Sequence, residues 1–161
     1  MNPTNFQAVD PAYADRVRAS FYGQPFMGLI GAQITALAPG QCDIRLPFKP
    51  ELTQQIGYFH AGIIGTIADN AGGYAALSLT PAGMEVLTVE YKINLLAPGT
   101  GEALIARGRV LKAGRTLIVC RSDVFNIKNG AETLAAAATL TLLPIAHPNL
   151  NGAPQNAEGG R

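Results

Sequence analysis

Alternating apolar and polar positions predict strands in two stretches of the chain. In the first, Cys42, Ile44, Leu46 and Phe48 alternate with polar residues, which is the period of a strand with one buried face. The apolar segment 30–38 precedes it, and the Pro39-Gly40 pair between them is a turn signal. We therefore expect a hairpin here.

The second stretch contains four further predicted strands. In residues 87–95 the apolar set Leu87, Val89, Tyr91, Ile93 and Leu95 alternates with Thr88, Glu90, Lys92 and Asn94, which predicts one buried face. Segments 103–112, 115–126 and 133–143 follow, separated by the turn signals Ala113-Gly114 and Asn129-Gly130. The last segment is rich in alanine, a weak strand former, so a helix there stays an alternative.

Two segments have helical character. Residues 10–22 predict a short helix with Asp10 as its cap and Pro11 at the first helical position. Residues 60–79 predict a long apolar helix that ends before Pro81. Its length would suit a bilayer, but Asp69 lies in its middle, and a carboxylate at that depth is costly. A buried helix of a globular domain is the better interpretation.

This order of elements predicts an α+β fold, with a six-stranded antiparallel sheet wrapped around one long central helix. We expect an N-terminal segment with the short helix over residues 1–27, the main domain over 28–146, and a disordered tail over 147–161. The open edges of such a sheet favour edge-to-edge pairing with a second copy.

Composition restricts the possible functions. Charged residues make up only 14% of the 161 residues, which is typical of a surface partly hidden in an oligomer. The net charge is +1 without a basic tract, so the sequence gives no sign of nucleic-acid binding. Cys42, Cys120 and the two histidines match no metal-binding spacing, and we expect no metal. The first ten residues lack a signal-peptide pattern, which favours the cytoplasm.

Asp69 is the residue that points most directly to chemistry. A buried carboxylate without a partner costs several kcal/mol or shifts its pKa upward. The neighbouring helical positions Gly65, Thr66, Gly72 and Gly73 offer no positive charge. Asp69 therefore either bonds to backbone or hydroxyl groups as a structural residue, or it takes part in a reaction.

The start of the same helix, at His60 and Ala61, is a second candidate. The first N–H groups of a helix lack internal partners and stabilise negative charge, such as the oxyanion of a tetrahedral intermediate. A plain capping role for His60 is the alternative. Asp69 lies nine residues later, ~13.5 Å along the axis and on the opposite side. A two-fold dimer with antiparallel helices could bring the two groups together.

The segment around these residues resembles the PaaI-type thioesterases of the hotdog superfamily. Gln54, His60 and Asp69 match the family's spacing, as do the run 68–73 and the segment 88–91, and the resemblance covers roughly residues 28–143. It implies a hotdog fold and an acyl-CoA thioesterase that acts as a homodimer with a shared active site and forms a homotetramer.

The resemblance also implies a role for each residue of the segment. Asp69 would be the nucleophile or the base that activates water, and Gln54 would orient the water or the carbonyl group. The N–H of Ala61 would polarise the thioester, His60 would order the helix start, and Thr88 would assist near the point of attack. The family usually has glycine where this chain has Ala61, so a left-handed backbone there would strain this chain.

Coenzyme A is part of the substrate in this interpretation, and no separate cofactor is expected. Its phosphates require cations, and the cluster Arg107, Arg109, Lys112 and Arg115 surrounds the hairpin at residues 113–114. A solvated hairpin tip is the alternative for this cluster. The acyl group stays open between aromatic and medium- or long-chain types. A non-catalytic acyl-binding module, or less readily a hydratase or dehydratase, are the other functions that the sequence leaves open.

Overall fold

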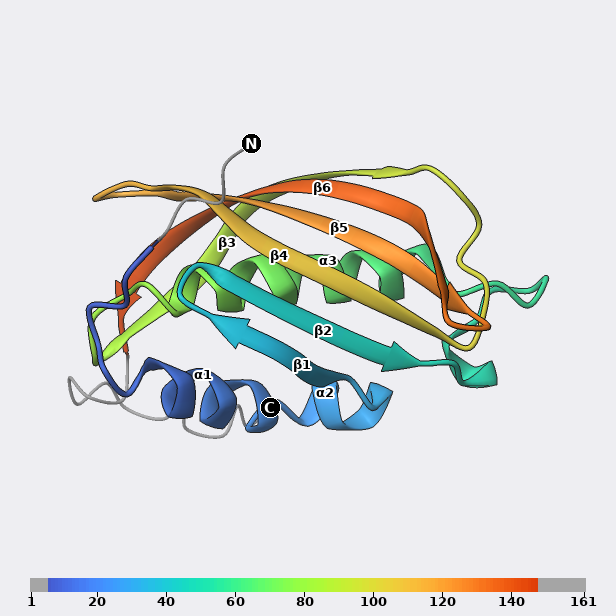
Figure 1. Ribbon diagram of the computed structural model, residues 1–161, viewed down its shortest axis with the longest axis horizontal. Coiled ribbons are helices and arrows are strands. Elements are labelled where there is room, and N and C mark those ends of the chain that lie inside the picture. Colours follow the sequence, from blue (N-terminus) through green and yellow to red (C-terminus); the bar gives the residue numbers. More distant parts are fainter. Residues whose placement is uncertain (1–5, 148–161) are drawn as a thin grey trace, which may run out of the picture.

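A 17-residue helix, α3 (Ala61–Leu77), lies against one face of a six-stranded antiparallel sheet that curves around it (Figure 1). The computed structural model describes residues 6–147. The strands follow the order β1-β2-β4-β5-β6-β3 across the sheet. Their bounds are β1 Gln33–Ala38, β2 Gln41–Pro47, β3 Met84–Leu95, β4 Ala103–Ala113, β5 Ile118–Lys128 and β6 Ala131–Ala146. The predicted hotdog architecture is confirmed, and the alanine-rich last segment is a strand.

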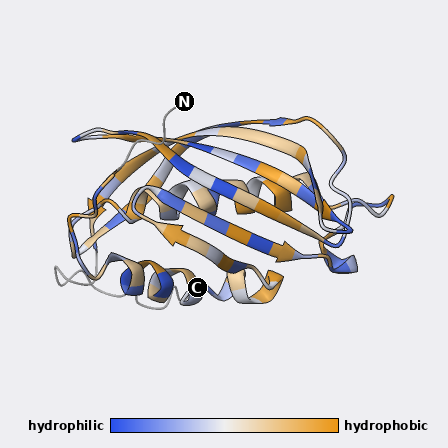
Figure 2. Ribbon diagram, viewed as in Figure 1, coloured by the Kyte–Doolittle hydropathy of each residue, from blue (hydrophilic) through white to orange (hydrophobic). Residues whose placement is uncertain are grey.

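The core lies between α3 and the inner face of the sheet. Apolar and polar residues alternate along the strands, as the banded colours of β2 and β4 in Figure 2 show. Alternate side chains of a strand point to opposite faces, so Ile44, Leu46 and Leu104 are buried on the helix side. At Gly108 of β4 the helix comes very close: a Cβ there would lie 2.0 Å from the carbonyl oxygen of Ala71. Glycine is required at this crossing because a larger residue would displace the helix.

The hairpin turns form where the sequence indicates. Asn129 and Gly130 join β5 to β6 with φ angles of 51° and 74°, which is the positive pair that a two-residue type I′ turn requires. Gly40, with φ of 75°, follows Pro39 between β1 and β2.

Strand β3 departs from the predicted alternation. Thr88 pairs with Leu142 and Glu90 with Thr141, so Val89 is an extra residue, a β-bulge. Cross-strand partners share a face of the sheet, so Thr88 joins the buried Leu142 on the helix side. Beyond the bulge it is Tyr91, opposite the buried Leu140, that faces inward. The predicted inward position of Leu87 is wrong because the bulge reverses the phase of the strand; Leu87 is 55% exposed.

The N-terminal region forms two short helices, α1 (Tyr13–Tyr22) and α2 (Pro25–Ile30), beside β1 (Figure 1). Helix α2 was not predicted, and the expected boundary at residue 28 falls inside it. The expected cap at Asp10 is also wrong. The N-cap position is Ala12, and the Asp10 carboxylate accepts a hydrogen bond from the Ala12 N–H and one from Arg16.

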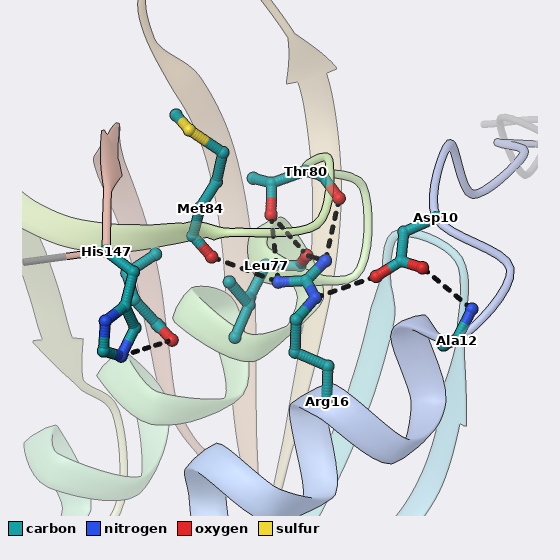
Figure 3. A network of polar contacts seen from close by, with 8 residues as sticks. Asp10, Ala12, Arg16, Leu77, Thr80, Met84 and His147 are labelled. Carbon is teal, nitrogen blue, oxygen red and sulfur yellow. Dashed lines mark hydrogen bonds and ion pairs between the residues drawn. The ribbon is translucent and has the colours of Figure 1, made fainter. Parts of the chain in front are cut away.

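Arg16 ties α1 to the end of α3 and the start of β3 (Figure 3). Its guanidinium donates to the carbonyl oxygens of Leu77, Thr80 and Met84 at 2.8–3.3 Å. The ion pair with Asp10 at 2.9 Å holds the guanidinium in place and keeps the pKa of Asp10 below its ordinary value. The network thus fixes the loop that leads from α3 into β3.

Two expectations concern the rest of the chain. The predicted tail 147–161 lies outside the described residues except for His147, whose N–H donates to the Gly83 carbonyl. Within residues 6–147, no helix has both the length and the apolar character that crossing a membrane requires.

Candidate active site

Asp69 lies in the middle of α3 and faces β3. It is half-buried, and its carboxylate accepts a 2.8 Å hydrogen bond from the Thr88 hydroxyl. Burial raises the pKa of Asp69 above its ordinary value, and the Thr88 hydrogen bond acts in the opposite direction. Asp69 forms no ion pair with any described residue. The bulge at Val89 makes this contact possible. If the same strand paired without a bulge and kept Tyr91 on the inner face, Thr88 would point to the outer face of the sheet, away from Asp69.

A cavity of about 120 Å³ opens beside this carboxylate, between α3 and β3. From Asp69 it follows α3 toward its C-terminus, where Tyr74 and Leu77 are buried. Its other lining residues are Gln24, Asn70, Gly73, Glu85, Val86 and Thr88.

The start of α3 has the geometry of an oxyanion site. His60 is the N-cap, and its Nδ1 accepts a 2.9 Å hydrogen bond from the Gly62 N–H. Its carbonyl oxygen accepts from Ile63 and Ile64. Among the described residues no acceptor contacts the N–H of Ala61, which is the first helical residue. Asn129 is the one non-glycine residue in 6–147 with positive φ, so Ala61 is unstrained where the family usually has glycine.

Gln54 lies near this helix start, in the loop before it. Its side-chain oxygen accepts a hydrogen bond from the Ile56 N–H, and its backbone N–H donates to the Tyr58 carbonyl at 2.8 Å. Gln54 and Ala61 both line a second, larger cavity of about 400 Å³. The remaining walls are mostly apolar: Tyr58, Phe59, Ile64, Leu95, Leu96, Ala97, Pro98 and Gly99.

Within one chain the predicted site residues therefore form two groups. Asp69 and Thr88 line the first cavity, whereas Gln54 and Ala61 line the second. Ala61 and Asp69 are eight positions apart on α3, ~12 Å along the helix axis. One thioester carbonyl cannot contact both groups in a single chain.

The basic cluster is also divided. Arg107 forms ion pairs with Glu132 at 2.8 Å and Asp43 at 3.6 Å, and Arg109 pairs with Asp43. Arg107 and Arg109 flank Gly108 in β4, and Gly108 faces α3. Their side chains therefore lie on the outer face of the sheet. Lys112 and Arg115 are exposed at the β4–β5 hairpin. A role in binding coenzyme A stays a prediction for all four residues.

Sequence reasoning missed the polar residues that surround the far part of the first cavity. The Gln24 amide donates hydrogen bonds to the Tyr74 hydroxyl and, at 3.3 Å, to Asn70 Oδ1. Ser20 lies 3.3 Å from the same Tyr74 hydroxyl. Of these residues, only Asn70 could be singled out from the sequence, because it is adjacent to Asp69. Gln24 could not, because it comes from a segment that shows no apolar period.

The described residues contain neither a cluster of metal-binding side chains nor a reactive thiol. No group of three or more potential ligands lies together among residues 6–147. Cys42 and Cys120 are free and buried, and burial raises the pKa of each thiol to about 12. Neither forms a thiolate near neutral pH.

Comparison with known proteins places the chain in a family. The profile of the thioesterase superfamily matches residues 56–133. The crystal structure of a thioesterase family protein from Silicibacter pomeroyi is 44% identical, covers 83% of this chain and 98% of its own, and superposes with a TM-score of 0.82. Human acyl-coenzyme A thioesterase 13 is 31% identical over 98 residues, 60% of this chain and 69% of that protein.

A more distant structure shares the fold. The PaaI protein of Escherichia coli is 18% identical, covers 86% of this chain and 97% of its own, and has a TM-score of 0.77. Among the curated relatives that it matches, the chain spans from 64% to 82% of their own length. The chain therefore belongs to the thioesterase superfamily, a family of thioester-hydrolysing enzymes.

Proposed function

We propose that this chain hydrolyses the thioester of an acyl-coenzyme A to a free acid and coenzyme A, with Asp69 as the catalytic carboxylate. The observation that carries the proposal is the half-buried Asp69, which lines a cavity and is hydrogen-bonded by Thr88 alone among the described residues. A structural carboxylate at this depth would be expected to have several donors or a cation. The name of the human relative, an acyl-coenzyme A thioesterase, supports the substrate class.

Asp69 can act in either of two ways. As a general base it takes a proton from water while the water oxygen attacks the thioester carbonyl. As a nucleophile its own oxygen attacks, and water then hydrolyses the resulting anhydride. In both cases the C–S bond breaks when the tetrahedral intermediate collapses, and the sulfur leaves as the thiolate of coenzyme A, which then takes up a proton.

The N–H of Ala61 is suited to bind the developing oxyanion, since it lies at the helix start without an acceptor. Gln54, in the same cavity, would orient the carbonyl or the water. His60 would act as a cap because its Nδ1 is engaged by the Gly62 N–H. Thr88 would fix the orientation of the carboxylate.

A complete site, with Asp69 and Thr88 next to Gln54 and Ala61, requires a second copy of the chain. Strand β3 is an edge of the sheet, 12 residues long, with exposed apolar side chains at Leu87, Val89, Tyr91 and Leu95. A long, apolar and unpaired edge favours strand pairing with another chain. Pairing of β3 with its copy about a two-fold axis would set the two α3 helices antiparallel, and would bring Asp69 of one chain toward Ala61 of the partner. We propose this homodimer, assembled further into a tetramer, as the active form in the cytoplasm.

Release of free thiol from a panel of acyl-coenzyme A substrates tests the function. We expect turnover with at least one of them, and loss of that turnover in Asp69→Asn. Tight binding of acyl-coenzyme A without thiol release would identify a non-catalytic binding module instead. Consumption of an enoyl substrate without thiol release would identify a hydratase.

A further inference from the structure

We infer that Gln24 forms a wall of the acyl pocket and limits the substrate to acyl groups of about the volume of one six-membered ring. The inference rests on the proposed function, because it assigns the acyl group of that substrate to the cavity beside Asp69. It adds a specificity-determining residue from the N-terminal region, outside the segment 56–133 that matches the family.

The direction of the cavity shows which part of the substrate it accepts. From Asp69 to Leu77 the cavity follows α3 for eight residues, ~12 Å along the axis. At the far end lie the buried Tyr74 and Leu77. The arm of coenzyme A must continue from the sulfur into solvent, whereas an acyl group can end inside the protein. The cavity beside Asp69 therefore suits the acyl group, and the larger cavity at the helix start of the second chain in the proposed dimer suits the arm.

The volume of this cavity restricts the acyl group. It holds about 120 Å³. An apolar cavity of roughly 150 Å³ in another protein accommodates benzene, so the present cavity suits a single ring or a short chain. A long fatty acyl chain would need the cavity to extend past its present end.

Gln24 lies on the wall of this cavity, against Asn70 and the buried Tyr74, and is held in place. It is the N-cap of α2, between Gly23 and the conformationally restricted Pro25. Its amide nitrogen donates to the Tyr74 hydroxyl and to Asn70 Oδ1, so both of its hydrogens are used. Asn70 is in turn bonded to the Thr66 carbonyl at 2.9 Å. A longer alkyl chain would have to separate these groups and leave them unpaired against hydrocarbon, which is unfavourable.

The test measures kcat/KM for straight-chain acyl-coenzyme A substrates from two to twelve carbons and for the benzoyl derivative. For the native enzyme we expect the highest values at six carbons or fewer or with benzoyl, and values at least about tenfold lower at ten carbons. Gln24→Ala should raise the ratio of the ten-carbon to the four-carbon value by about tenfold. Gln33→Ala, at an exposed position of β1, is the matched control and should leave that ratio unchanged.

Gln24→Asn provides a milder variant if the alanine variant loses stability, and it should shift the ratio less but in the same direction. Native enzyme that hydrolyses the twelve-carbon substrate as fast as the four-carbon one would overturn the inference while leaving the proposed function intact. An unchanged ratio in both folded Gln24 variants would overturn the role of Gln24. Absence of thiol release from every substrate would instead refute the proposed function.

Discussion

The Thr88 hydroxyl lies 2.8 Å from the Asp69 carboxylate and joins the edge strand β3 to the middle of α3. The contact crosses 19 residues of sequence, and it coexists with an inward Tyr91 because the strand accommodates Val89 as a bulge. It gives the buried carboxylate one donor, which is enough to orient it and too few to neutralise it.

Asp69→Asn should lower turnover by about a hundredfold or more, because the amide can neither accept a proton from water nor attack a carbonyl. The amide has nearly the same shape, and burial disfavours the charged form that it replaces. We therefore expect a melting temperature at pH 7 that is equal to or above that of the native protein. A lower melting temperature with little change in turnover per folded molecule would assign Asp69 a structural role instead.

Thr88→Val should move the acidic limb of the pH profile of kcat/KM to higher pH. Burial already raises the pKa of Asp69, and the Thr88 hydrogen bond lowers it, so removing the donor raises the pKa further. Only the ionised form is active, so activity then appears at a higher pH. Thr88→Ser keeps the donor and should keep the limb in place. If Thr88→Val leaves the limb unmoved, Asp69 is not the group that titrates.

The same raised pKa predicts the pH dependence of stability. The folded protein binds the Asp69 proton more tightly than the unfolded chain does. The stabilisation that comes from this proton is fully present below the pKa of about 3.9 in the unfolded chain, and it is lost as pH rises through the higher pKa in the folded protein. In denaturant unfolding, the free energy of unfolding of Asp69→Asn should exceed that of the native protein by an amount that grows as pH rises from 4 to 8. A constant difference over this range would contradict the raised pKa.

Ala61→Pro tests the oxyanion donor without breaking the helix. Proline is well tolerated at the first helical position, and His60 has the extended backbone that precedes proline, with φ of −62° and ψ of 139°. The substitution removes the N–H alone, so we expect a loss of about 10²- to 10³-fold in kcat with unfolding behaviour preserved. Ala61→Ser, which keeps the N–H, is the control. Full activity of a folded Ala61→Pro protein would exclude this N–H from catalysis.

The shared site predicts complementation between two inactive variants. When Asp69→Asn and Ala61→Pro chains are unfolded together and refolded, half of the dimers should be mixed, and each mixed dimer has one intact site. About a quarter of the native activity should return. Each variant refolded alone is the control. No recovery, despite mixed dimers detected by mass spectrometry, would mean that both residues act within one chain.

The sequence was sufficient to predict the order of the six strands and the central helix, because long periodic segments and the Asn129-Gly130 turn each have a local physical cause. It also made Asp69 a candidate for catalysis, since a carboxylate in an apolar helix is unusual at the level of sequence; that role stays a prediction. It failed at Leu87 and Val89, where a bulge that depends on pairing with β6 reverses the phase. It also failed at Gln24, whose proximity to Tyr74 is created by tertiary packing across 50 residues of sequence.

The bulge in β3 has a consequence for how the protein tolerates insertions and deletions. Strand β3 consists of two halves in opposite phase, and Val89 is the residue that joins them. Deleting Val89 would leave Thr88, Glu90 and Tyr91 opposite Leu142, Thr141 and Leu140, as they are now, so the shortened strand would be regular and would keep Thr88 and Tyr91 on the inner face. The full-length strand paired without a bulge, in contrast, could keep Thr88 on Asp69 or Tyr91 beside Gly65, but not both. Irregularity at this single position is thus what allows one strand to serve the reacting carboxylate and the helix packing at once.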